Sequence, residues 1–399
     1  MITTEEFRAE AGAFLAANAK PKVKVGEAWG EGSDEVGLLA ERTPEEDARL
    51  VAQAKAWRAK VFDAGFGWIT GPEAYGGRAL PREYDRLWQS LEKDYDTPGI
   101  GPFGIGLGMV APTILAHAVE DVRRRYLQSL YRGDVVACQL FSEPVAGSDL
   151  AGIQAKALRD GDEWVLNGQK VWTSGAHYSD IGEIITRTAT YPDSRHRGLT
   201  MFLVDMKAPG VEVRPLRQMT GGASFNEVFF TDVRVPDEYR LGDVDEGWTV
   251  ALTTLMNERM AIGGGSVGSG MDLAGRLTAL TRHMGRDGDP VVRQQLADVL
   301  IRHSVNRYTS LRAMAKMRAG QLPGPELSTL KLALTNNMQK MSALLTELLG
   351  PRLVADTGEW GTYAWSQFVM TVPGMRVAGG TDEVLHNIIG ERVLGLPKG

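Results

Sequence analysis

The sequence predicts an α+β protein whose elements follow the chain in the order helices, strands, helices. Two observations support this order. Apolar side chains recur at helical spacing in the first third and again after residue 247, whereas between about residues 137 and 236 they alternate with polar ones, as in half-buried strands. We therefore predict an N-terminal helical domain at 1–136, a middle β domain at 137–240 and a C-terminal helical domain at 241–399.

One helix of the first domain shows both its start and its end in the sequence. Thr43-Pro44-Glu45-Glu46 supplies an N-cap residue, a proline at the first helical position and a capping-box glutamate. Leu50, Ala54 and Trp57 follow at helical spacing, and Gly65 marks the end. The sequence therefore predicts a helix that begins directly after Thr43.

Strands are expected in the middle domain because β-branched and aromatic residues alternate there with polar ones. Trp164–Leu166 and Gln169–Trp172 flank Asn167-Gly168, a dipeptide typical of a hairpin turn. The further predicted strands are 199–204, 211–214 and 227–235, and the later predicted helices are 248–261, 291–318 and 327–349.

Composition narrows the classes of function. Lys plus Arg number 44 and Asp plus Glu number 50, so the formal net charge of −6 attracts neither nucleic acid nor an anionic membrane, and a small ligand is the expected partner. The one cysteine, Cys138, excludes an intramolecular disulfide and suits a reducing compartment. The N-terminus shows neither the basic nor the apolar region of a signal peptide, so we expect a cytoplasmic protein.

One uncharged stretch, residues 97–119, is long enough to cross a membrane. Its prolines and glycines would leave backbone groups unpaired in lipid, so buried structure without a membrane span is predicted instead.

Two common ligand motifs are weak here. Gly263–Gly268 matches G-x-G-x-x-G, but the preceding residues have a helical pattern and no strand leads into the glycines, so packing between helices is favoured over a nicotinamide site. The six histidines lack ligand spacing, and no metal site is predicted.

Two other segments together outline a site for a planar ligand. Residues 138–149 (CQLFSEPVAGSD) read as a short strand that breaks at Pro144 into a loop with hydroxyls and free backbone N–H groups; an ordinary turn is the alternative. About thirty residues later, Lys170–Gly175 adds an indole and two more hydroxyls.

Both segments closely resemble signatures of the acyl-CoA dehydrogenase family. The resemblance extends over nearly the whole chain, through Gly247-Trp248, residues 225–236 (FNEVFFTDVRVP) and Gly379–Glu383. It implies an N-terminal helical domain, a middle β-barrel and a C-terminal four-helix bundle. It also implies FAD as cofactor, an acyl-CoA substrate, electron-transfer flavoprotein or a similar electron acceptor, and a homotetramer or dimer.

The resemblance assigns roles to individual residues. Ser142 would hydrogen-bond near the reactive edge of the flavin, Trp172 would cover one face of the ring, and Ser174 would donate near N5. Ser148 would lie where the cofactor meets the CoA thioester. The implied cofactor-binding residues are Gln139, Phe141, Ser142, Gly147, Ser148, Trp172, Ser174, Thr381 and Glu383, and the implied substrate-binding residues are Ser148, Arg259 and Gly380. For Trp172 alone, a core aromatic of the barrel is the alternative.

The chemistry requires a carboxylate that removes the α-proton of the thioester. Many family members carry this glutamate directly before the Gly-Thr of the C-terminal motif, where this chain has Gly379. Glu258 is the candidate instead, because a minority of the family, including isovaleryl-CoA and long-chain acyl-CoA dehydrogenases, has its base at that helix position. A Glu258–Arg259 ion pair is the alternative, although adjacent helical residues do not face each other. The N–H of Gly379 would point at the thioester oxygen.

Three functions stay open: an FAD-dependent acyl-CoA dehydrogenase, a related flavin oxidase, and a non-catalytic subunit of a mixed tetramer. The flavin motifs and Glu258 favour the first. For the substrate, Gly104, Gly106 and Gly108 lie in the segment that lines the acyl cavity in this family, so either a branched or bulky acyl group or close helix packing accounts for them.

Overall fold

The computed structural model describes residues 2–22, 29–38, 42–261, 272–318 and 327–398, which form two compact units. Unit 1 comprises Met1–Lys24, Arg42–Gln218 and Gly222–Leu255, and unit 2 comprises Val25–Glu41, Met219–Gly221 and Met256–Gly399. Gly263–Gly268 lies outside the described residues. The division into three domains stays a prediction, since the first two fall into one unit.

Five helices and a small strand pair precede the main sheet in unit 1. The helices are α1 (Thr4–Asn18), α2 (Pro44–Asp63), α3 (Arg82–Glu92), α4 (Ala111–His117) and α5 (Glu120–Arg132), and β1 (Lys20–Pro21) pairs with β2 (Tyr95–Asp96). The predicted capping box of α2 is confirmed. The Thr43 side chain accepts from Glu46 N at 3.2 Å, and the Glu46 carboxylate accepts from Thr43 N at 2.9 Å.

The uncharged stretch folds as short helical segments. Gly101–Phe103 forms a 3₁₀ turn, Gly106–Val110 forms a π-helix, and α4 continues from it. Among the described residues, we find no helix with the length and apolarity needed to cross a membrane. A π-helical turn is often associated with a functional site.

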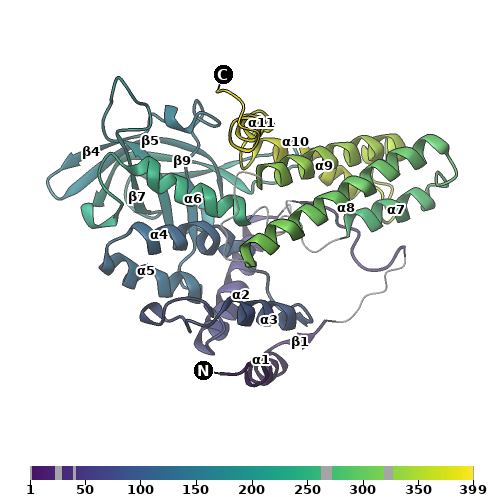
Figure 1. The fold of residues 1–399 in the computed structure, drawn as a ribbon, viewed down its shortest axis with the longest axis horizontal. Coiled ribbons are helices and arrows are strands. Elements are labelled where there is room, and N and C mark those ends of the chain that lie inside the picture. The colour runs from purple at the N-terminus through teal and green to yellow at the C-terminus, as the bar shows by residue number, and fades with distance from the viewer. Residues whose placement is uncertain (1, 23–28, 39–41, 262–271, 319–326, 399) are drawn as a thin grey trace. The chain divides into compact units, whose positions relative to one another are not determined.

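The main sheet of unit 1 has eight strands among the described residues. They are β3 (Ala137–Leu140), β4 (Lys156–Asp160), β5 (Glu163–Ser174), β6 (Ile181–Arg187), β7 (Leu199–Asp205), β8 (Val211–Leu216), β9 (Phe225–Pro236) and β10 (Arg240–Leu241). Figure 1 labels β4, β5, β7 and β9 of this sheet. The order is β10-β7-β6-β4-β5-β9-β8, and β3 pairs with β6 in parallel. The predicted strands at 199–204, 211–214 and 227–235 are confirmed.

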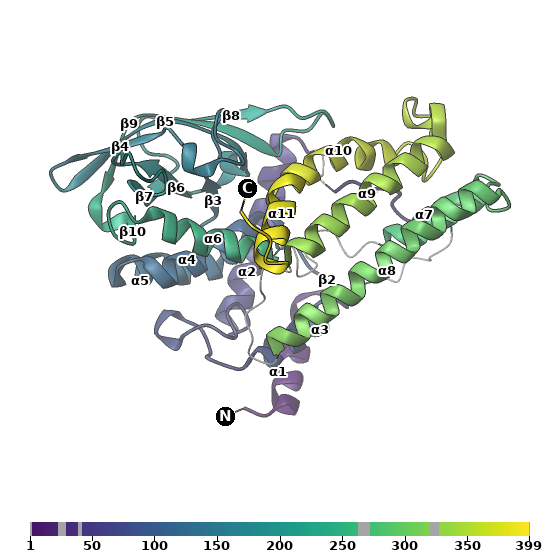
Figure 2. The same cartoon turned by 45° about the horizontal axis from the view of Figure 1, so that its top comes forward.

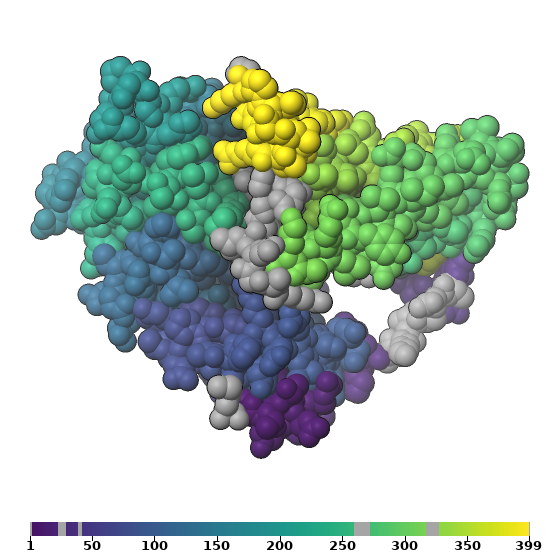
Figure 3. Space-filling view, in the orientation of Figure 1, coloured from purple at the N-terminus to yellow at the C-terminus, as the bar shows by residue number. Residues whose placement is uncertain are grey.

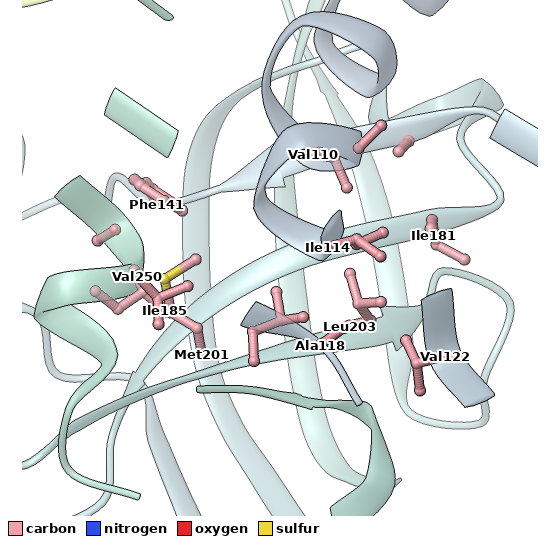
Figure 4. Close-up of a cluster of buried hydrophobic side chains, with 14 of the residues drawn as sticks. Val110, Ile114, Ala118, Val122, Phe141, Ile181, Ile185, Met201, Leu203 and Val250 are labelled. Carbon is pink, nitrogen blue, oxygen red and sulfur yellow. The ribbon is translucent and has the colours of Figure 1, made fainter. Parts of the chain in front are cut away.

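Both faces of this sheet are buried, so β6 and most of β7 carry almost continuous apolar runs. One face packs on α4, α5 and α6. Figure 4 shows Val110 of the π-helix and Ile114 of α4 against Ile181, Ile185 and Leu203 of the strands. On the other face, side chains from strands far apart in the sheet order fill a common core, as barrel closure requires. They include Trp164, Phe202, Val204, Phe230 and Val235.

The predicted hairpin turn at Asn167-Gly168 is wrong. Strand β5 runs through it, and the β4–β5 turn lies at Gly161, where φ is +64°. Instead, Asn167-Gly168 forms an irregularity in the β5–β9 pairing, where the Asn167 amide exchanges two hydrogen bonds with Asp232. A Cβ on Gly168 would lie 2.6 Å from Ala155 Cα, so the glycine is required for close strand approach rather than for a turn.

Unit 2 is helical (Figure 2). Helix α6 (Gly247–Ala261) begins in unit 1 and ends in unit 2, and α7 (Leu273–His283), α8 (Pro290–Arg318), α9 (Leu327–Leu349), α10 (Trp365–Val377) and α11 (Asp382–Ile388) follow. Helix α9 packs between α8 and α10, and its Met341, Leu345 and Leu348 join Trp365 and Phe368 in the core. The helices predicted at 248–261, 291–318 and 327–349 are confirmed.

Candidate functional site

The two motifs predicted to hold a planar ligand lie side by side in unit 1. Strand β3 ends at Leu140, and the chain then runs alongside β5. Val171 N donates to Ser142 O at 2.9 Å, and Lys170 Nζ donates to Phe141 O at 3.0 Å. The fold therefore joins segments that are about thirty residues apart in the sequence.

Trp172 has an unusual backbone. It lies in a register shift of β5 against β9, and its φ is +60°, a conformation that costs roughly 1–3 kcal/mol for a residue with a side chain. Its indole is 59% exposed and touches Phe225 edge to face at 6.0 Å. A core aromatic, the alternative weighed from the sequence, would be buried. Instead, a strained bulge turns a large apolar ring outward, a feature typical of functional positions.

The polar side chains around this indole are available to a ligand. Ser142 and Ser174 are partly exposed, and Gly147 and Ser148 are exposed. Within the described chain, no side-chain hydrogen bond to another residue involves Ser142, Ser148, Ser174 or Gln139. The two adjoining segments therefore offer an exposed ring together with uncommitted hydroxyls and an amide, which is the donor and acceptor set that an isoalloxazine ring requires, so these residues fit FAD.

Phe141 points its side chain into the protein core, unlike the exposed or partly exposed residues Ser142 and Ser148 of the same motif. Its side chain is buried in the core that includes Val250 (Figure 4). Its carbonyl is bound by Lys170, so the residue anchors the motif to the core and to β5.

A buried ion pair supports this region, and sequence reasoning assigned it no role. Lys170 Nζ lies 2.8 Å from Glu143 Oε1, and the Glu143 carboxylate also accepts from the backbone N–H groups of Gln154 (2.6 Å) and Ala155 (3.0 Å). Burial lowers the pKa of Lys170 to about 8, and the Glu143 carboxylate opposes that shift. The signal available in the sequence was Lys170, a charged residue two positions before Trp172 in a predicted strand, because a buried lysine requires a counter-ion.

The C-terminal motif lies in unit 2. Gly379 and Gly380 have φ of +66° and +96°, which only glycine adopts without strain. Thr381 caps α11, its side chain accepting from Val384 N at 3.3 Å. Glu383 is exposed, and hydrogen bonding to its own backbone N–H and to Thr381 lowers the pKa of its carboxyl.

Three further residues hold this motif in place, and sequence reasoning missed them. Asp382 is buried and accepts from Arg376 Nε at 2.7 Å. Lys331 donates to Gly380 O at 2.8 Å and lies 3.7 Å from Asp382 Oδ1. Burial lowers the pKa of Lys331. The lysine thus fixes the carbonyl of a glycine that the sequence placed at the substrate.

The candidate base lies on α6. Glu258 is partly exposed, and the side chain of Arg259 lies outside the described residues. The flavin motifs belong to unit 1, and Glu258 and residues 379–383 belong to unit 2. Across the described ranges, the structure brings together no group of three or more His, Cys, Asp or Glu side chains suited to a metal ion.

Comparison with known proteins identifies the class. The model "Acyl-CoA dehydrogenase, middle domain" matches residues 138–233, and "Acyl-CoA dehydrogenase, C-terminal domain" matches residues 245–394. The chain is 33% identical to acyl-CoA dehydrogenase IpdE1 of Mycobacterium tuberculosis over 407 residues, which covers 100% of this chain and 99% of the relative. The chain belongs to the acyl-CoA dehydrogenase family of flavin-dependent oxidoreductases, which confirms the family predicted from the sequence.

Solved structures show the same fold. The structure titled "Tcur3481-Tcur3483 steroid ACAD" superposes with a TM-score of 0.74 at 24% identity, covering 99% of this chain and 98% of that one. The ChsE4-ChsE5 complex from Mycobacterium tuberculosis gives a TM-score of 0.70 at 26% identity, covering 100% and 99%. The α+β fold predicted from the sequence is confirmed.

Proposed function

We propose that this chain is an FAD-dependent acyl-CoA dehydrogenase that oxidises the Cα–Cβ bond of an acyl-CoA thioester to the trans-2-enoyl-CoA. The observation that carries this proposal is Trp172, an exposed indole at φ +60°, held beside the uncommitted hydroxyls of Ser142 and Ser174. FAD bound there would supply the hydride acceptor for Cβ.

The chain's own residues supply binding and proton transfer. Glu258 takes the α-proton as general base, so that the proton and the hydride leave from adjacent carbons. The N–H of Gly379 points at the thioester oxygen, and its positive φ fits a position without a side chain. Ser148, Arg259 and Gly380 contact the substrate. The family resemblance implies Gln139, Phe141, Gly147, Thr381 and Glu383 as the remaining cofactor-binding residues.

We propose a branched or alicyclic acyl group as the substrate class. A Cβ built on Gly104 meets no described atom within 4 Å, and one on Gly106 meets Ala137 at 3.5 Å, an ordinary contact. Packing against the described residues therefore does not account for the missing side chain at Gly104, whereas Gly106 is buried against Ala137 and Leu130. The open position at Gly104 supports a wide acyl cavity.

We also propose assembly with a second acyl-CoA dehydrogenase chain, the same or a related one, and reoxidation by electron-transfer flavoprotein or a similar acceptor. Helix α8, the light-green ridge in Figure 3, carries a stripe of exposed apolar side chains. The stripe consists of Ile301, Val305, Tyr308 and Leu311, which recur at intervals of three or four residues. Such a stripe supports a helix-packed interface.

Anaerobic reduction of the FAD-loaded protein by acyl-CoA esters tests the proposal. The panel contains straight-chain, isoalkanoyl and cyclohexanecarbonyl esters and one steroid ester, chosen because a fold neighbour is titled a steroid enzyme. We expect bleaching of the flavin absorption, fastest with a branched or alicyclic ester. Rapid oxygen uptake by the reduced protein would indicate an oxidase. FAD binding without reduction by any ester would indicate a non-catalytic subunit.

A further inference from the structure

A carboxylic acid lies buried between three elements of unit 1 and has no role in the proposed reaction. Glu183 projects from β6 and is 0% exposed. Its Oε1 lies 2.5 Å from Thr254 Oγ1 of α6, which lies 2.9 Å from Thr113 Oγ1 of α4. The Thr113 hydroxyl also donates to the Met109 carbonyl at 2.9 Å, within the π-helix. Both threonines are fully buried.

The protons in this chain can be counted. Three short oxygen–oxygen contacts, of 2.5–2.9 Å, link Glu183, Thr254, Thr113 and the Met109 carbonyl, and each hydrogen bond needs one proton. The Val250 carbonyl is a more distant acceptor for Thr254 Oγ1, at 3.5 Å. The two threonine hydroxyls supply two, and the carbonyl supplies none. For all three short contacts to be hydrogen bonds, the third proton has to come from Glu183, with donation running from the acid to the Met109 carbonyl. An ionised Glu183 would leave one contact without hydrogen.

The surroundings of Glu183 also favour the neutral acid. Its Oε2 is buried and, within the described chain, has no hydrogen-bond partner. A lone carboxylate oxygen is far more costly to bury than a carbonyl oxygen. No salt bridge to Glu183 forms among the described residues. Burial raises the pKa of Glu183 to about 8, and only donation from Thr254 Oγ1 to the ionised carboxylate would oppose that shift.

Two titratable neighbours, Cys138 and His117, do not compete for this proton. Gln139 of β3 pairs with Glu183 in the sheet and carries no charge. Cys138 of β3 stays a thiol, because burial raises its pKa to about 12. On α4, His117 bonds to Thr253, and burial lowers the pKa of its imidazole. Glu258 lies one turn beyond Thr254 on α6.

We propose that Glu183 is a positioning residue that acts as a neutral acid. Its proton completes the hydrogen-bond chain that joins β6 to α6 and to the π-helix, and β6 pairs directly with β3 of the first flavin motif. This inference rests on the proposed function only for its effect on the cofactor. Loss of the proton breaks the chain at a strand that lies directly beside Gln139. The consequence expected is weaker FAD binding at alkaline pH.

Infrared difference spectroscopy tests the protonation without any cofactor. Wild type minus Glu183→Gln should show the carbonyl band of a neutral carboxylic acid at about pH 6, and that band should disappear as the pH rises through about 8. Glu163→Gln, in the same sheet but paired with Arg234, is the control and should not remove the band. Absence of the band in the wild type at about pH 6 would overturn the inference.

Titration with FAD tests the positioning. Glu183→Gln keeps a neutral donor and should bind FAD like the wild type at about pH 6, whereas Glu183→Leu should bind about tenfold more weakly, the loss of one buried hydrogen bond. At about pH 9, wild-type affinity should fall while that of Glu183→Gln stays constant. Identical pH profiles of wild type and Glu183→Gln would refute the positioning role. Failure of both proteins to bind FAD would instead refute the proposed function, and the infrared band would still decide the protonation.

Discussion

Lys170 Nζ and Glu143 Oε1 lie 2.8 Å apart, and solvent reaches neither side chain appreciably. The pair connects the middle of the first flavin motif to the strand that presents Trp172, because Lys170 also binds the Phe141 carbonyl. The ammonium group of Lys170 therefore holds together the two segments that form the proposed cofactor site.

We expect Lys170→Met to lower the free energy of unfolding by about 3–5 kcal/mol, because it leaves the Glu143 carboxylate buried without its counter-ion. FAD affinity should fall in parallel. Arg234→Met, which removes an exposed pair with Glu163, is the matched control and should cost about 1 kcal/mol or less. The double variant Lys170→Met, Glu143→Leu should recover part of the loss. Urea unfolding of Lys170→Met at the wild-type midpoint would contradict this account.

Trp172→Gly should separate stability from function. Glycine adopts φ +60° freely and the exposed indole contributes little burial, so the unfolding free energy of the apoprotein should stay equal or rise by up to about 1 kcal/mol. FAD affinity should fall, and the flavin fluorescence quenched by the indole should increase. Trp172→Phe, which keeps a ring, should retain most of the affinity. A large loss of apoprotein stability in Trp172→Gly would show that the indole is a structural residue.

Features that depend on neighbouring residues in the sequence could be predicted, whereas features that depend on contacts between distant segments could not. The capping box at Thr43 depends on residues three positions apart, so it could be predicted. Asn167-Gly168 has the composition of a turn, but Ala155 approaches Gly168 from another segment and makes it part of a strand. Glu183 lies within an apolar run, and its partner Thr254 is 71 residues away, so no local pattern indicates that the pair exists.

The pH dependence of unfolding should differ between the wild type and Glu183→Gln. The folded protein holds the Glu183 proton up to about pH 8, whereas the unfolded chain releases it near 4.5. Between these values the folded state binds one more proton, so wild-type stability should fall with rising pH by up to about 1.4 kcal/mol per unit relative to the variant. Urea unfolding at a series of pH values measures the difference. Parallel stability curves would exclude a neutral Glu183.

The stripe on α8 should determine the oligomeric state. A charge at Val305 would lie in the centre of the stripe, so Val305→Glu should shift the protein to a smaller species in light scattering. Val354→Glu is the matched control, because Val354 is also an exposed valine of unit 2 but lies outside α8. If both variants keep the wild-type mass, the stripe is not the interface.

The assignment of the base gives the sharpest kinetic test. Glu258→Gln should bind FAD and acyl-CoA normally but reduce the flavin about 10²–10⁴-fold more slowly, since an amide cannot accept the α-proton. Asp243→Asn, an exposed carboxylate near the start of the same helix, should reduce at the normal rate. Near-normal reduction by Glu258→Gln would place the base elsewhere.

Gly379→Glu in the Glu258→Gln background tests whether the two positions serve the same carbon. The backbone at Gly379 has φ +66°, so a side chain there costs roughly 1–3 kcal/mol of strain and should lower stability measurably. If the new carboxylate nevertheless reaches the α-proton, flavin reduction should recover in part, and its pH profile should follow a carboxyl group. Gly379→Gln in the same background carries equal strain without a base and should not recover. Recovery in both variants would mean that side-chain bulk, rather than proton transfer, changes the rate.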